Sequence, residues 1–167
     1  MSYFNRDFFT SSDTNPPLIT VSARTYLTIS NRVEFDTQDI HYEAHPDPAN
    51  NLIGLHSFAN FSHPLARTHK YLKLYFDKTI ESGSYSVSDP DFPFDLFHYV
   101  ELGTKGDGSA GILYEPTTGT VTVEVIEVSP EKLHYQINYD FKASGNFNED
   151  LTISGESTFI VMLRKTY

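Results

Sequence analysis

The chain has 167 residues, a size typical of a single domain that can bury a hydrophobic core of its own. It contains no cysteine, which excludes disulfide bonds, thiolate metal sites and cysteine nucleophiles. Its formal net charge of −10 argues against binding to nucleic acid or to an anionic membrane surface, because both partners require clustered lysine and arginine.

Residues 1–17 are predicted to form an N-terminal arm, followed by a single antiparallel β domain over residues 18–167. The arm ends in Pro16 and Pro17, and proline cannot donate to a strand ladder. Asp7 interrupts the stretch that would have to be apolar in a secretory signal. We therefore expect a cytoplasmic protein by default, with export by another route left open.

Alternation of apolar and polar residues predicts strands along most of the chain, because successive strand side chains point to opposite faces. The first is Ile19–Ile29, with Val21 and Leu27 on its apolar face. Further strands are expected over residues 33–35, 40–44, 52–58, 71–76, 82–87, 96–102, 111–114, 120–128, 133–141 and 151–163. Loops are expected at 45–51, 60–68 and 89–95, and a hairpin turn at Pro116–Gly119.

The clearest alternation lies in the C-terminal third. Odd positions from Leu133 to Phe141 are apolar and even positions are polar, and the pattern resumes from Leu151 to Leu163. The last three strands, from Thr120 onward, should form a continuous meander. Gly155 within the last strand predicts a bulge or a sharp bend.

About nine to eleven short strands with frequent turns and no helix are typical of an all-β fold. The pattern predicts an antiparallel β-sandwich, with a curved antiparallel β-barrel as the alternative. The pattern predicts no particular oligomeric state.

A transition-metal site is one hypothesis. His41, Glu43 and His45 alternate along a predicted strand and share one face. Neighbours in such a series are about 7 Å apart, so His41 and Glu43 could ligate one ion. A third ligand would have to come from His56, His69, His98 or His134. The competing interpretation is a set of polar residues on a solvated face.

The loop at 89–95 carries two further hypotheses. Asp89, Asp91 and Asp95 could bind calcium, although Asp-Pro also starts ordinary turns. Phe92 and Phe94, with Tyr99 on the next strand, could stack on a sugar or dock a peptide. Alternatively, loop aromatics between prolines fold back onto the core.

Three functions remain open on the sequence. The first is a non-catalytic binding domain whose end loops contact a protein or carbohydrate partner, without a cofactor. The second is a barrel that holds a small apolar ligand. The third is a metal-dependent enzyme built on His41 and Glu43.

Overall fold

The computed structural model describes residues 18–47, 49–63, 66–102, 111–146 and 149–164. The predicted arm, residues 1–17, lies outside the described residues. Within these ranges the chain forms strands and turns but no helix, so the all-β prediction is confirmed. The described residues accordingly contain no helix that could span a membrane. The ten strands are β1 (Leu18–Ile29), β2 (Phe35–Thr37), β3 (Asp39–Ala44), β4 (Leu52–His63), β5 (Ala66–Asp77), β6 (Gly83–Ser86), β7 (Phe94–Leu102), β8 (Gly111–Val128), β9 (Lys132–Gly145) and β10 (Asp150–Arg164).

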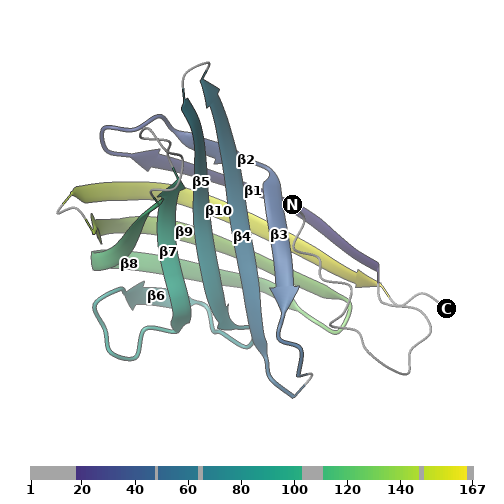
Figure 1. The fold of residues 1–167 in the computed structure, drawn as a ribbon. Helices are drawn as coiled ribbons and strands as arrows, with labels where there is room; N and C mark the ends of the chain where they lie inside the picture. Colours follow the sequence, from purple (N-terminus) through teal and green to yellow (C-terminus); the bar gives the residue numbers. More distant parts are fainter. Residues whose placement is uncertain (1–17, 48, 64–65, 103–110, 147–148, 165–167) are drawn as a thin grey trace.

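All ten strands belong to one antiparallel sheet, in the order β2-β1-β10-β9-β8-β7-β5-β4-β3, with β6 paired to β8. The outermost strands, β2 and β3, are joined in the chain through a single residue, Gln38. The sheet therefore curves until β1 and β2 come back against β3 and β4 (Figure 1). It is nearly closed into a barrel, an arrangement between the predicted sandwich and its barrel alternative.

Strands β8, β9 and β10 are consecutive neighbours in the sheet, as the predicted meander requires. The predicted hairpin turn at Pro116–Gly119 is wrong, because β8 runs through it from Gly111 to Val128. The pairing of β8 with β9 slips between Pro116 and Thr118. A bulge accommodates a proline that cannot donate to the ladder, so the strand continues where a turn was expected.

The side chains inside the curved sheet alternate along the strands as the sequence predicts. In β10 Phe159 is fully buried, while Thr158 on the other face is half-buried. Aromatic rings meet across the interior, with the centroids of Phe97 and Phe141 4.9 Å apart. The inward residues of β9 are all buried: Leu133, Tyr135, Ile137, Tyr139 and Phe141.

Gly155 lies in β10 opposite Leu27 of β1 and Tyr139 of β9, and both registers run through it without a break. The prediction of a bulge is therefore wrong, and its alternative, a sharp bend, stays a prediction. Gly155 instead has a φ of +148°, and a Cβ atom there would lie 2.1 Å from the carbonyl oxygen of Tyr26. Glycine is required at this position by the backbone and by the close approach of β1.

Hydroxyl groups bridge the seam, the line along which β1 and β2 return to β3 and β4. Thr25 Oγ1 of β1 lies 2.7 Å from Ser57 Oγ of β4 and 2.7 Å from Ser157 Oγ of β10. The Tyr139 hydroxyl donates to Ser157 Oγ at 3.0 Å. Thr25, Ser57 and Ser157 are fully buried, and buried hydroxyls require such partners. The Thr25–Ser57 bond joins the two sides of the seam, and the bonds to Ser157 fix the position of the Thr25 hydroxyl.

Candidate functional site

A group of ionised and hydroxyl side chains lies at the end of the sheet where β1, β7 and β9 finish and β5, β8 and β10 begin. They come from both strands and connections and are joined by hydrogen bonds and ion pairs. We call this group the charged cluster; its members are Arg32, Lys70, Tyr99, Glu101, Tyr114 and Glu149.

Arg32 enters the charged cluster from the turn between β1 and β2. The backbone N–H of Arg32 donates to the carbonyl of Ile29 at 3.1 Å, which closes the turn. Asn31 has a φ of 57°, a left-handed conformation that asparagine tolerates better than most residues. The Asn31-Arg32 pair therefore reverses the chain and directs the guanidinium toward Glu101.

Glu101 is the centre of the charged cluster. Arg32 Nε donates to both of its carboxylate oxygens at 3.1 Å, and the Tyr99 hydroxyl donates to Oε1 at 2.8 Å. Lys70 Nζ lies 3.5 Å from the same Oε1. One buried carboxylate thus faces two cations and a phenol, which is the pairing that a charge needs away from water.

Glu149 holds the outer side of Arg32. Arg32 Nη2 lies 2.8 Å from each oxygen of the Glu149 carboxylate. The Tyr114 hydroxyl donates to Glu149 Oε2 at 2.9 Å and accepts from Arg32 Nη2 at 3.3 Å. Two donors from separate parts of the chain therefore converge on a single carboxylate.

Burial and charge displace the pKa of several members of the charged cluster. Burial lowers the pKa of Lys70, and Glu101 opposes that change. Burial raises the pKa of Tyr99, and the Glu101 charge and hydrogen bond raise it further. Hydrogen bonds from Arg32 and Tyr114 lower the pKa of Glu149. Such displaced pKa values concentrate at functional sites, which makes the charged cluster the candidate site.

The structure places the predicted metal ligands on the outer face of the sheet, where they contact different partners. His41 Nε2 lies 3.1 Å from Asp39 Oδ1. Glu43 Oε2 accepts a 2.7 Å hydrogen bond from Tyr75 and lies 3.9 Å from His56 Nε2. Of the residues predicted as further ligands, His56 is the one that approaches Glu43.

His56 belongs to a cross-strand series that we call the histidine row: His41, His56, Lys73 and His98. The His56 side chain is only 8% exposed, and its Nε2 has no hydrogen-bond partner among the described residues. Burial lowers the pKa of His56, Glu43 opposes this, and Lys73 and His41 lower it further. In the described ranges no three His, Asp or Glu side chains are grouped to hold a metal. The metal hypothesis stays a prediction.

The three aspartates lie at the opposite end of the sheet, Asp89 and Asp91 between β6 and β7 and Asp95 at the start of β7, and all are exposed. Asp89 Oδ1 accepts from the backbone N–H of Asp91 at 2.9 Å, and the Asp89 carbonyl accepts from the N–H of Phe92 at 3.0 Å. This is a side-chain-stabilised turn. Calcium binding by Asp89, Asp91 and Asp95 stays a prediction.

The predicted ligand-binding aromatics pack against or within the core. Phe94 is 7% exposed and Tyr99 is 1% exposed. Phe92 is half-buried, with its ring centroid 5.0 Å from that of Phe94. Tyr99 therefore meets the charged cluster from inside the sheet, while a role of Phe92 in ligand binding stays a prediction.

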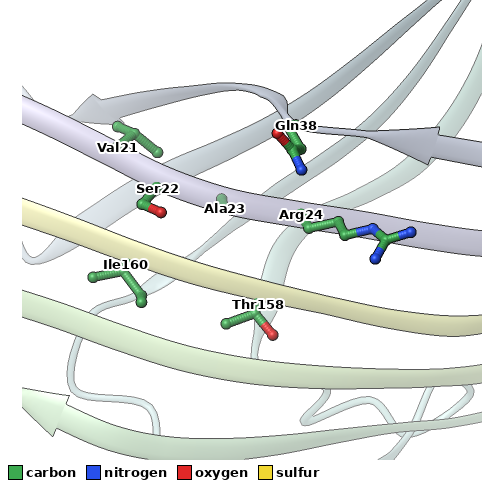
Figure 2. Close-up of a pocket in the computed structure, with 7 residues that line it drawn as sticks. All are labelled: Val21, Ser22, Ala23, Arg24, Gln38, Thr158 and Ile160. Carbon is green, nitrogen blue, oxygen red and sulfur yellow. The ribbon is translucent and has the colours of Figure 1, made fainter.

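A groove of about 390 Å³ lies beside β1, where β2 ends and the chain passes through Gln38 (Figure 2). Arg24, the one charged residue that lines it in the described part of the chain, has a 60% exposed side chain and is paired with Asp36 at 2.8 Å. Exposed pairs of this kind contribute little energy. The charged cluster, with its buried charges, is the stronger candidate.

Comparison with protein-family models, curated proteins and solved structures found no match to this chain. The site therefore has to be judged on its own chemistry. The sequence analysis did not single out Arg32, Lys70, Glu101, Tyr114 or Glu149. One signal was available: Lys70 continues the inward series of Leu72 and Leu74, so a charge stands on an apolar face.

Proposed function

We propose that the protein is a non-catalytic binding domain, and that its ligand binds at the end of the sheet that holds the charged cluster. The burial of Lys70 and Glu101, which are 5% and 8% exposed, carries this proposal. Buried ion pairs are often no more stabilising than apolar residues of similar volume. Charges retained at this position therefore support a role in recognition.

Binding is favoured over catalysis because the ionised members of the charged cluster are engaged with one another. Arg32 contacts Glu101 and Glu149, and Lys70 contacts Glu101. A general base or nucleophile needs a group that can reach a substrate proton or carbon. A compensated set of charges instead fixes the position of a complementary group on a ligand.

We also propose that the sheet acts as a curved barrel rather than a sandwich. The bond between Thr25 of β1 and Ser57 of β4, which bridges the seam, supports this. Ligand sites often lie in the mouths of such barrels, which fits a site among the end connections. A protein or carbohydrate partner at the opposite end, at the half-buried Phe92, remains the alternative.

Two-dimensional ¹H–¹⁵N NMR with a fragment library tests the binding proposal. Separate pools would contain small carboxylic acids, amines, alcohols and disaccharides. We expect backbone signals of Arg32, Glu101 and Tyr114 to shift with at least one pool. Shifts confined to the turn from Asp89 to Phe92 would support the alternative site, and no shift at the charged cluster at millimolar concentrations would refute the proposal.

A metal-dependent enzyme is the second candidate, on one observation. His56 Nε2 is buried 3.9 Å from Glu43 Oε2 and makes no hydrogen bond within the part of the chain that the structure describes, so one ion could contact both atoms. Metal analysis of the purified protein tests this, with His56→Ala compared against His98→Ala. A stoichiometric transition metal lost only in His56→Ala would support the enzyme, and trace metal in all three proteins would argue against it.

A further inference from the structure

We infer that the ligand bound at the charged cluster carries a carboxylate, and that Glu149 occupies the position of that carboxylate. This inference rests on the proposed binding function and names the chemical class of the ligand. In the structure the Glu149 carboxylate accepts hydrogen bonds from Arg32 and Tyr114, and the same two donors would suit the carboxylate of a ligand.

The donors around Glu149 match the requirements of a carboxylate. Arg32 Nη2 lies 2.8 Å from both carboxylate oxygens, and the Tyr114 hydroxyl lies 2.9 Å from Oε2. Hydrogen bonds from a guanidinium to a carboxylate are among the strongest in proteins, because both groups are ionised at neutral pH. The two donors are fixed independently, Arg32 by the turn at Asn31 and Tyr114 by its position in β8.

Glu149 is the member of the charged cluster that can leave most easily. Its side chain is 42% exposed, whereas that of Glu101 is 11% exposed. Glu149 also lies in the connection between β9 and β10, while Glu101 stands within β7. Glu149 can therefore rotate into water at a lower cost than the buried Glu101.

The charge balance favours an anion once Glu149 has moved away. Arg32 and Lys70 are opposed by Glu101 and Glu149, two cations against two carboxylates. Without Glu149 the charged cluster has one positive charge in excess, partly shielded from water. A ligand carboxylate would restore neutrality at the same two donors.

Benzoate serves as the probe, because it is a small carboxylate and its neutral amide, benzamide, has nearly the same shape.

Removing the internal carboxylate is the direct test. Glu149 competes at the high effective concentration of a tethered group, so Glu149→Gln should bind benzoate at least about tenfold more tightly than the wild type. Glu124→Gln, on the exposed outer side of β8, is the matched control for the loss of one negative charge. Glu149→Ser provides a second variant, and thermal melts of every variant verify that it is folded.

Further comparisons test whether the site is specific for a carboxylate. Binding in each is followed by NMR at low ionic strength. Arg32→Lys added to Glu149→Gln should lose the gain, because lysine cannot reproduce the guanidinium contacts. Benzamide should bind no better to Glu149→Gln than to the wild type. Sulfate that binds as well as benzoate would refute a carboxylate-specific site.

Equal benzoate affinity in wild type and Glu149→Gln would overturn the carboxylate inference. The proposed binding function would still stand if other fragments shift the signals of the charged cluster. If neither benzoate nor any fragment pool shifts the signals of the charged cluster in either protein, both the carboxylate inference and the proposed binding function are overturned.

Discussion

Tyr75 and Glu43 are joined across an intervening strand. They stand on β5 and β3, with Gly54 of β4 between them in register, and the Tyr75 hydroxyl donates to Glu43 Oε2 at 2.7 Å. A Cβ atom at Gly54 would lie 2.9 Å from Tyr75 Cε1. The tyrosine ring therefore occupies the space that a side chain on β4 would fill.

We predict that Gly54→Ala lowers the free energy of unfolding by about 1 kcal/mol, because crowding the ring outweighs the better strand propensity of alanine. In a Tyr75→Ala background the same change should be neutral or stabilising. Tyr75→Phe keeps the ring and serves as the control, in which the cost should persist. Urea denaturation of the double-mutant cycle measures the coupling. An equal cost of Gly54→Ala in all backgrounds would contradict the ring contact.

Gly155→Ala should be more damaging than Gly54→Ala. The obstacle is the backbone of Tyr26 at 2.1 Å, which cannot swing aside, and the φ of +148° is strained for alanine. We expect a loss of at least about 2 kcal/mol. Gly83→Ala is the matched control, because a Cβ there would meet nothing closer than 3.4 Å. Similar melting temperatures for the two variants would mean that β1 and β10 are not paired in this register.

A third prediction concerns which face of β10 is buried. Phe159 is fully buried whereas its neighbour Thr158 lies on the opposite face, so Phe159→Ala should cost roughly 3–5 kcal/mol. Thr158→Ala should remain within about 0.5 kcal/mol of the wild type. Chemical denaturation compares them. A larger loss for Thr158→Ala would show that the two faces of β10 are exchanged.

A fourth prediction concerns pH. Burial lowers the pKa of His56 in the folded protein, whereas the unfolded chain has the ordinary value of about 6.5. As the pH falls through that value, the unfolded state gains a proton that the folded state resists. Stability should therefore decrease on acidification, by at most about 1.4 kcal/mol per pH unit for one proton.

The variant that isolates this contribution is His56→Phe, which keeps a ring and removes the titrating group. It should show a shallower loss of stability than the wild type between pH about 7.5 and about 5.5. Some slope should remain, because burial also lowers the pKa of His98. Parallel stability curves for the two proteins would show that His56 does not titrate abnormally.

Strand existence and side-chain facing could be predicted wherever alternation was strong, as in Leu133–Phe141. Loop positions were predicted less well, because single prolines were given too much weight as signals that a strand ends. Pro64 suggested a loop over 60–68, yet β4 continues to His63 and β5 begins at Ala66. Pro116 suggested a turn, yet the neighbouring strand keeps β8 extended through a bulge.

The candidate site was harder to predict for a topological reason. Arg32 and Glu149 are 117 positions apart, and they meet because β1 and β10, the first and last described strands along the chain, are neighbours in the sheet. Alternation within one strand contains no information about strand order. The histidine row shows the same limit, since the approach of His56 on the next strand to Glu43 depends on strand pairing.

The pairing of β1 with β10 also has a consequence for synthesis. β1 is synthesised before β10, but its partner over the whole of Leu18–Ile29 is residues 153–164. Until those residues have been made, β1 presents an unsatisfied strand edge to its surroundings or to a chaperone. Contacts this distant in sequence are formed slowly, and the exposed edge is prone to aggregation in the meantime. Nascent chains stalled before β10 should therefore be far more sensitive to protease than released chains.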